Sequence, residues 1–519
     1  MLAKKIIHEW DEVKYYFRKR FFLPKVTEKK KIVVLGSGWG ALSFIQHLDT
    51  DVVDLKIYSP RPYFFYTPLL AGTTTGTLSH SSIVEPMRWY HKASYVQAEC
   101  NEINLEKKVL KLSTATGTKF DQEYDYLLIA VGADIATFNI PGVAEYAFFM
   151  KEVNDSVKLQ NKYLNNLERA AALKSSGKSD VDKEIDRLLH WVIVGAGPTG
   201  VELTAEFCDF ISQDLNLYFP SVADRVRVTL VEASGRVLGS FDQETAEYAK
   251  RVLEDSGATV ICNASVARIT DSTIDINLKQ LPASLQYNSI FSSSLTEASP
   301  GSAHSHQVTV PYGVVVWAAG VVTRPLVKQL CAQIGPPAQS SRWGLTVDSR
   351  LRVAGVADGS VFAVGDCADS GCGPTAQAAS QTGTYVGRML RNTNFNHDKI
   401  ERYPSFVYNY KGSMAYVGGS RAVAELKFAI WDHHPTDNKI QTINKKDSKE
   451  LTKSSSDRVH LLGRGGFALW RMLYYSYLLS GRTRVQVAFD WMRTQVFGRE
   501  IASTTFQFPH PMVTPDSKT

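Results

Sequence analysis

The chain lacks three features that would each have assigned it to a familiar class of protein. Its few cysteines show neither a CxxC pair nor zinc-ligand spacing, which argues against a structural metal and a secreted disulfide framework. No stretch reaches the roughly eighteen apolar residues of a membrane-spanning helix, so membrane contact would require a surface-lying segment. The two polar stretches, 279–307 and 432–458, lack the acid and glycine pattern of a calcium loop. The six cysteines, which favour a reducing compartment, are Cys100, Cys208, Cys262, Cys331, Cys367 and Cys372.

The remaining composition is ordinary for a globular protein. A chain of 519 residues with 44% hydrophobic and 21% charged side chains is long enough for two or three domains. Positive charge gathers at the beginning, where residues 1–31 hold ten Lys and Arg against four acids. We therefore set residues 1–30 apart as a basic segment. Its favoured interpretation is mitochondrial targeting, although acids are unusual in such a segment, and the alternative is a basic helix on the fold or membrane.

An apolar strand that runs into a glycine turn occurs twice. Residues 31–36 form the first, and residues 191–195 repeat it after a Lys- and Glu-rich helical stretch at 153–189. Each is followed downstream by another apolar strand that closes in a turn of small residues. These turns, which we assign to the nucleotide sites, are Ala130, Val131 and Gly132, and Ala319 and Gly320.

The first glycine turn fits the dinucleotide-binding pattern G-x-G-x-x-G/A. Its first glycine allows a tight turn, its second lets the backbone approach a pyrophosphate, and its small third residue lets the helix pack on the strand. The phosphate would then lie at the helix N-terminus, where free N–H groups and the helix dipole favour negative charge. The expected binding residues are Gly36, Ser37, Gly38, Trp39, Gly40 and Ala41.

The second turn repeats the pattern with three glycines. Its second strand, residues 228–232, ends in Glu232, a carboxylate suited to the ribose hydroxyls of NADH and repelled by the 2′-phosphate of NADPH. The same carboxylate could instead cap a turn, and residues 213–225 lengthen the spacing beyond the usual value. The other expected binding residues are Gly195, Gly197, Pro198, Thr199 and Gly200.

Two nucleotide turns in one chain predict two bound nucleotides. The economical pairing is a flavin in the first and NADH in the second, so that a hydride can pass between the two rings. A dinucleotide turn favours FAD and leaves FMN as an alternative. The second strand of the flavin domain, however, ends in Ser59 rather than an acid.

From residue 31 to about 502 the chain resembles the type II NADH dehydrogenases, which are single-chain NADH:quinone oxidoreductases. Residues 59–70 resemble the family segment that follows the second strand of the flavin domain. This resemblance explains why Ser59 occupies the position where other flavoproteins have an acid. Residues 195–203 resemble the NADH motif of the family. Residues 362–366 resemble the family strand whose aspartate holds the ribityl chain of the flavin. By this resemblance Glu202 lies at the nicotinamide, and the flavin ligands include Ser59, Pro60, Arg61, Thr67, Gly365 and Asp366.

Residues 376–381 resemble the family's AQxxxQ signature, whose glutamines face the quinone. Spacing alone places Gln377 and Gln381 on one helix face, where they could simply be solvated. The resemblance assigns Gln377 and Gln381 to quinone reduction and Ala376 to the flavin site. Residues 406–419 resemble the strand pair beside that site, which adds Lys411 and Tyr416 as candidates.

The resemblance implies an α/β fold with two Rossmann-like, glutathione-reductase-like domains, the NADH domain being inserted in the flavin domain. The expected segments are flavin domain 31–150 and 326–400, NADH domain 151–325, and a C-terminal domain 401–519 with membrane-anchoring helices. Two polar stretches, 279–307 and 432–458, are expected to be exposed loops. The implied activity is NADH:ubiquinone oxidoreduction with ping-pong kinetics and without proton pumping. The implied enzyme is a homodimer that lies at the surface of the mitochondrial inner membrane, and nucleic acid is not expected as a partner.

The anchor is expected from two amphipathic faces near the C-terminus. The first comprises Trp470, Leu473, Tyr474, Tyr477 and Leu478, and the second Val485, Ala488, Phe489, Met492 and Val496. Several arginines surround them, as in a helix pair lying among lipid headgroups. The alternative is a helix pair packed on its own domain or in a dimer interface.

Two rival functions remain at this point. Cys367 and Cys372 have the C-x4-C spacing of a disulfide reductase, but they follow the Asp366 motif, whereas in that class the pair follows the first glycine turn. The other rival is a flavoprotein redox sensor similar to apoptosis-inducing factor, which would show slow flavin reduction and no quinone reaction.

Overall fold

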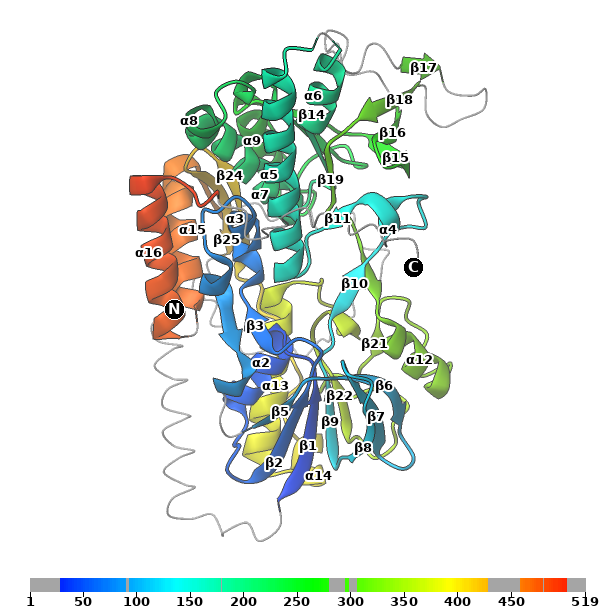
Figure 1. Ribbon diagram of the computed structural model, residues 1–519. Coiled ribbons are helices and arrows are strands. Elements are labelled where there is room, and N and C mark those ends of the chain that lie inside the picture. Colours follow the sequence, from blue (N-terminus) through cyan, green and yellow to red (C-terminus); the bar gives the residue numbers. More distant parts are fainter. Residues whose placement is uncertain are drawn as a thin grey trace, which may run out of the picture. The chain divides into compact units, whose positions relative to one another are not determined.

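The computed structural model describes residues 29–89, 93–178, 180–279, 295–297, 306–427, 458–478 and 480–501 (Figure 1). The basic segment 1–30 lies almost wholly outside the described residues, as does most of 432–458. The chain divides into two compact units. Unit 1 comprises Met1–Phe64, Glu85–Asp134 and Val322–Tyr410, and unit 2 comprises Phe65–Val84, Ile135–Val321 and Lys411–Thr519. Residues 65–84 and the C-terminal domain therefore belong to the same unit as the second glycine turn.

Unit 1 is built on a five-stranded parallel sheet in the order β22-β9-β1-β2-β5. The apolar part of the central strand is almost completely buried, since Ile32, Val33, Val34 and Leu35 are each at most 1% exposed. Burial on both faces is what a continuous apolar run predicts for a parallel strand. The strands are β1 (Lys30–Leu35), β2 (Val53–Tyr58), β5 (Ser94–Val96), β9 (Tyr126–Ile129) and β22 (Val361–Ala363).

Two long helices of unit 1, α2 (Trp39–His47) and α13 (Ala376–Thr393), pack closely together. The contact runs through glycines, because a Cβ on Gly383 would collide with the backbone of Gly40 and one on Gly387 would lie 2.7 Å from the Phe44 carbonyl oxygen. An antiparallel sheet packs on the same core. Its strands are β6 (Ala98–Asn104), β7 (Val109–Thr114) and β8 (Lys119–Glu123), and the remaining elements are α12 (Pro325–Ile334), β21 (Leu345–Thr346), β23 (Ala368–Asp369) and α14 (His397–Glu401).

Unit 2 repeats this plan with a second five-stranded parallel sheet, ordered β11-β19-β12-β13-β14. In both sheets the strand before the glycine turn is central, which confirms the predicted duplication and the two Rossmann-like domains. The Lys- and Glu-rich stretch forms two helices, α5 (Val153–Ser175) and α6 (Asp182–Leu188). The sheet comprises β11 (Phe148–Phe149), β12 (His190–Val194), β13 (Arg227–Val231), β14 (Ala258–Ile261) and β19 (Val314–Trp317), with helices α7 (Pro198–Phe210) and α9 (Gln243–Asp255).

An antiparallel sheet also accompanies the parallel sheet of unit 2. It includes part of the stretch 279–307 that was expected to be an exposed loop, because Leu295–Glu297 forms a strand and His306 begins another, while most of the stretch lies outside the described residues. The strands are β15 (Ala264–Ile269), β16 (Thr273–Leu278), β17 (Leu295–Glu297) and β18 (His306–Pro311). Shorter elements of the chain are β3 (Tyr63–Phe65), α3 (Leu70–Thr74), β4 (Val84–Pro86), β10 (Ala133–Ile135), α4 (Val143–Tyr146), α8 (Asn216–Tyr218) and β20 (Val321–Thr323).

The C-terminal part of unit 2 consists of three antiparallel strands followed by two helices. The strands are β24 (Gly412–Gly418), β25 (Arg421–Lys427) and β26 (Arg458–Leu462), and the helices are α15 (Gly463–Tyr477) and α16 (Gly481–Phe497). Among the described residues, no helix combines the length and apolar character needed to cross a bilayer.

The two C-terminal helices differ in which faces they expose. On α16 the predicted stripe is exposed, with Val485, Phe489 and Val496 at 68%, 57% and 66%. On α15 only part of the expected face is exposed, because Tyr477 is 42% exposed, whereas Trp470 is 7% exposed and Leu478, just beyond the helix, is fully buried. Helical spacing identifies one apolar face but does not tell whether that face meets the protein's own core.

We expect Gly383→Ala to weaken unit 1, because its new methyl group would collide with the backbone of Gly40. Overpacking of this kind costs about 1–3 kcal/mol, which should lower the melting temperature and the flavin content of the purified protein. Gly373→Ala is the matched control, because a Cβ there meets nothing within 4 Å. Equal melting temperatures and flavin contents for the two variants would contradict the close helix packing.

Candidate functional site

The first glycine turn has the geometry that a bound pyrophosphate requires. Gly36 has φ +117°, and a Cβ there would collide with the carbonyl oxygen of Ala130. Its N–H donates to the Tyr58 carbonyl (2.8 Å), which holds the turn against β2. Gly38 is the N-cap of α2, and a Cβ there would meet only the tip of Arg61, at 3.8 Å. The helix N-terminus is therefore accessible to a phosphate group.

Serines and an arginine take the place of the usual acid at the end of β2. The Ser37 and Ser59 hydroxyls lie 3.1 Å apart, and Arg61 Nε donates to Ser37 Oγ (3.3 Å) and to the Tyr63 carbonyl (3.0 Å). The backbone N–H of Arg61 also donates to Ser59 Oγ (3.2 Å). This cluster presents hydroxyls and a cation, rather than a carboxylate, beside the glycine turn.

Two further predicted flavin ligands lie at the carboxyl edge of the same sheet. Asp366 follows β22 in a short 3-10 turn, and Gly365 before it has φ +70°. The Gly365 N–H donates to Thr382 Oγ1 (3.2 Å), which ties this turn to α13. The turn of Ala130, Val131 and Gly132 follows the neighbouring strand β9 at the same edge. Unit 1 thus gathers its turns where a parallel sheet binds nucleotides, and the residues present fit FAD.

Gln381 has a backbone partner that sequence reasoning missed. Its side-chain Nε2 donates to the Asn409 carbonyl and its Oε1 accepts the Asn409 N–H, both at 2.9 Å. This pair of bonds holds residue 409 against α13. Gln377 lies one turn earlier, directly after the N-terminal residue Ala376, and Lys411 is an exposed residue of unit 2. Thr67 also belongs to unit 2, where it begins a 3-10 turn.

In the second glycine turn, each of the three glycines has the role that the sequence predicts for it. Gly195 has φ +100°, and its N–H donates to the Val231 carbonyl (2.8 Å). A Cβ on Gly200 would collide with the Gly195 carbonyl, so α7 packs directly on the turn. A Cβ on Gly197 would meet nothing within 4 Å, which leaves the middle of the turn accessible. Pro198 and Thr199 begin α7 at this point.

Glu232 bridges the end of β13 and the glycine turn. Its carboxylate accepts the Ala196 N–H (2.6 Å) and the Ser234 N–H (2.7 Å). The position of Glu232 is therefore compatible with both interpretations, the ribose ligand and the turn cap. Its carboxylate caps backbone N–H groups and lies at the end of β13, where the ribose of a bound dinucleotide is expected. Ala319 and Gly320 follow the neighbouring strand β19, as expected from the sequence.

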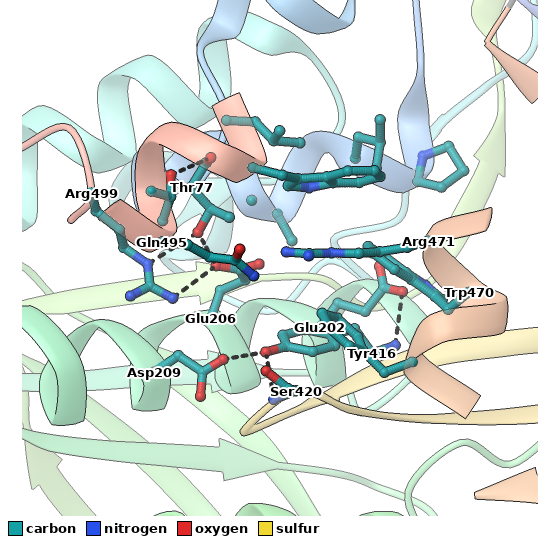
Figure 2. A pocket seen from close by; sticks show the side chains of 18 of the residues that line it. Thr77, Glu202, Glu206, Asp209, Tyr416, Ser420, Trp470, Arg471, Gln495 and Arg499 are labelled. Carbon is teal, nitrogen blue, oxygen red and sulfur yellow. Dashed lines mark hydrogen bonds and ion pairs between the residues drawn. The ribbon is translucent and has the colours of Figure 1, made fainter. Parts of the chain in front are cut away.

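A separate pocket lies within unit 2 and has acids on one wall (Figure 2). It has about 740 Å³ of empty space, part of it open to solvent. Glu202, Glu206 and Asp209 line it from α7, at the spacing that places side chains on one helix face. Burial raises the pKa of Glu202 to about 8, partly opposed by the Tyr416 N–H that donates to Glu202 Oε1 (3.2 Å). Burial also raises the pKa of Glu206.

The opposite wall of the pocket is aromatic and comes from the C-terminal domain. The ring of Trp470 lies 5.7 Å from that of Tyr416 and 6.5 Å from that of Trp491. The Tyr416 hydroxyl donates to Asp209, which connects the two walls. A buried arginine lies beside the acidic wall. Arg499 donates to Asp214 (2.6 Å) and lies 3.9 Å from Glu206.

Sequence reasoning found only part of this pocket. Glu202 and Tyr416 were candidates, whereas Trp470 was expected to face lipid. Glu206, Asp209 and Arg471 were missed, although three acids at positions i, i+4 and i+7 of an otherwise apolar helix are a detectable signal.

The cysteines show no sign of thiol chemistry. All six are free, and Cys367 is fully buried, with burial raising its pKa to about 11. The pKa of Cys372 is also raised by burial. A reactive cysteine needs a stabilised thiolate, which a raised pKa disfavours, so neither Cys367 nor Cys372 has the environment of a reactive thiol.

We expect Glu232→Ala to raise the Michaelis constant for NADH by about 10- to 100-fold, the effect of losing hydrogen bonds to a charged group. Flavin content should not change, because the flavin turn belongs to unit 1. Glu247→Ala, an exposed change on α9, is the control, and steady-state kinetics with NADH is the measurement. An unaltered Michaelis constant would leave Glu232 only as a turn cap.

Comparison with known families identifies two matching regions. Residues 30–383 match the pyridine nucleotide-disulphide oxidoreductase family, and residues 452–500 match the NDH2 C-terminal domain. The second match covers the two helices that follow the C-terminal strands.

Individual relatives match along most of the chain. A probable mitochondrial NADH-ubiquinone oxidoreductase of Schizosaccharomyces pombe is 35% identical, covering 92% of this chain and 84% of the relative. An external alternative NADH-ubiquinone oxidoreductase, mitochondrial, of Yarrowia lipolytica is 33% identical over 92% and 82%. The solved structure of NDH2 from Plasmodium falciparum in complex with NADH has a TM-score of 0.75 and 26% identity, covering 92% and 100%. The chain therefore belongs to the type II NADH dehydrogenases.

Proposed function

We propose that this chain is a flavin-dependent, non-proton-pumping oxidoreductase that transfers electrons from NADH to ubiquinone. The observation that carries the proposal is the duplicated parallel sheet, in which each copy leaves an accessible glycine, Gly38 or Gly197, at a helix N-terminus. Two nucleotide sites in one chain are what a hydride relay needs. The names of the fungal relatives and the NADH complex of the Plasmodium relative support the same activity.

The residues of unit 1 would hold FAD, which when bound supplies the hydride acceptor and the electron donor to quinone. The N-terminus of α2 would bind the pyrophosphate through backbone N–H groups after Gly38. Ser59 and Arg61 would meet the adenosine ribose, and Asp366 the ribityl hydroxyls. The N-terminus of α13, beginning at Ala376, adds a positive dipole end to the site.

The residues of unit 2 would hold NADH. The N-terminus of α7 binds the pyrophosphate at Gly197, and Glu232 accepts hydrogen bonds from the ribose hydroxyls. A 2′-phosphate would meet this carboxylate as a like charge, so the site favours NADH over NADPH.

We assign the pocket between α7 and the C-terminal helices to the quinone ring. Its aromatic wall suits an apolar ring. Its acidic wall can carry protons, since Glu202, which the resemblance places at the nicotinamide, has a pKa raised to about 8 by burial. Gln377 stays a proposed quinone-site residue. For Gln381 we propose a positioning role, because both ends of its amide hold the backbone of Asn409.

We propose that α16 lies against the mitochondrial inner membrane, from which the enzyme collects its quinone. The exposed stripe on α16 is accompanied by exposed Met472 and Phe497, at 62% and 77%. Arg482 and Arg484 at the start of the helix would attract anionic lipid. The homodimer implied by the family is likewise a proposal, and sedimentation equilibrium in detergent would test it.

The experiment that tests the proposed activity is steady-state turnover with NADH and a short-chain ubiquinone, followed by identification of the released flavin. We expect parallel lines in double-reciprocal plots, as ping-pong kinetics requires, and FAD in the released fraction. Slow flavin reduction by NADH with no quinone reaction would contradict the proposal and favour a redox sensor.

Membrane binding gives a separate prediction. Phe489→Ser should weaken binding to anionic phospholipid vesicles by about tenfold or more, because burial of a Phe side chain contributes about 1.5–3 kcal/mol. Phe138→Ser is the control, since Phe138 is 63% exposed but lies outside the C-terminal helices. Vesicle co-sedimentation measures both. If Phe489→Ser binds as the unmodified protein does, α16 is not the lipid-facing surface.

A further inference from the structure

Arg471 and Arg499 both line the pocket that we assigned to quinone, and Arg471 is held there by aromatic rings. Its guanidinium carbon lies 4.6 Å from the ring centre of Phe467 and 4.8 Å from that of Trp491. Both distances are within the range of cation–π attraction. Figure 2 shows the side chain extending across the pocket, with its guanidinium end directed to the side where Glu206 and Gln495 lie.

No acid neutralises this guanidinium within the part of the chain that the structure describes. Its Nε is buried and has no hydrogen-bond partner there. Burial lowers the pKa of Arg471, while Tyr416 and Glu206 act in the opposite direction through charge. A guanidinium stays protonated even so. Arg471 is therefore a half-buried cation that contacts two aromatic rings but has no hydrogen-bond acceptor for its N–H groups among the described residues.

The acids that line the pocket have hydrogen-bond partners other than Arg471. Glu206 Oε2 accepts the hydroxyls of Thr75 (2.8 Å) and Thr77 (2.6 Å) and lies 3.9 Å from Arg499. Asp209 accepts the Tyr416 hydroxyl. These contacts hold the acids on their own wall of the pocket. A ligand that enters the pocket can supply the acceptor that Arg471 lacks among the described residues.

We propose that Arg471 donates a hydrogen bond to a carbonyl oxygen of the quinone ring and stabilises the negative charge that this oxygen gains on reduction. The inference rests on the proposed function and adds a residue to it. Reduction adds two electrons and two protons to the quinone, so that both carbonyls become hydroxyls. The hydride from NADH supplies two electrons and one proton, and solvent supplies the second proton. Arg471 gives up no proton and acts only through charge and orientation.

The aromatic contacts make this a site for a planar cation in particular. Two rings against the guanidinium restrict its rotation and direct its N–H groups along one plane. The same rings, with Trp470, offer an apolar surface on which a quinone ring can stack. A lysine at this position would keep the charge but would lose the flat contact and the fixed N–H direction.

The test compares Arg471→Gln and Arg471→Lys with an exposed control, Arg251→Gln on α9. Binding of a short-chain ubiquinone to the oxidised holoenzyme is measured by equilibrium dialysis, alongside turnover with that quinone. We expect Arg471→Gln to weaken quinone binding and kcat/KM by about 10- to 100-fold, the loss expected for a hydrogen bond from a charged donor. Arg471→Lys should lie between it and the unmodified enzyme.

The readouts separate this role from a structural one. Flavin content and the rate of flavin reduction by NADH should not change in either variant. Unaltered quinone affinity in Arg471→Gln, together with normal quinone turnover, would overturn the assignment of Arg471 while leaving the proposed function intact. An unmodified enzyme that neither binds nor reduces quinone would overturn both.

Discussion

The structure depends on backbone meeting backbone at two glycine turns. At each turn the first strand leaves its sheet through a glycine with positive φ, Gly36 or Gly195, whose N–H bonds to the neighbouring strand. A side chain at Gly36 or at Gly200 would collide with a carbonyl oxygen. Because the strand, the turn and the helix are fixed by these close contacts, the free N–H groups of each helix N-terminus lie at the carboxyl edge of a parallel sheet.

The two units use the same frame and differ at one decisive position. At the end of the second strand, unit 1 has Ser59 with Arg61, whereas unit 2 has Glu232. A carboxylate suits ribose hydroxyls and disfavours a 2′-phosphate, while hydroxyls and a guanidinium present a different surface. One duplicated architecture can therefore bind two different nucleotides, as an electron relay requires.

Local patterns predicted what depends on neighbours in sequence. The buried strands, the glycine roles and the helices around them follow from apolar runs and from the need for positive φ, so they could be identified without a structure. The pocket could not, because α7 is separated from Tyr416 and the two C-terminal helices by more than two hundred residues. The acids on α7 become meaningful only when aromatic residues close the opposite wall.

Two residues show that a correct pattern does not tell which groups a side chain contacts. Trp470 belongs to an apolar face of α15, as predicted, but that face packs on Tyr416 instead of on lipid. Gln381 lies on the expected helix, yet its amide is bonded at both ends to the Asn409 backbone. Periodicity reports that a face is apolar or polar, and only tertiary contacts decide what it meets.

The central claim is that two nucleotides bound to one chain pass electrons from NADH to a quinone. Anaerobic double-mixing stopped-flow measures this most directly, because it separates flavin reduction by NADH from reoxidation by a short-chain ubiquinone. The account predicts that the flavin bleaches with NADH and regains its colour when quinone is added, each at a rate sufficient for turnover. A flavin that NADH reduces but quinone does not reoxidise would contradict it.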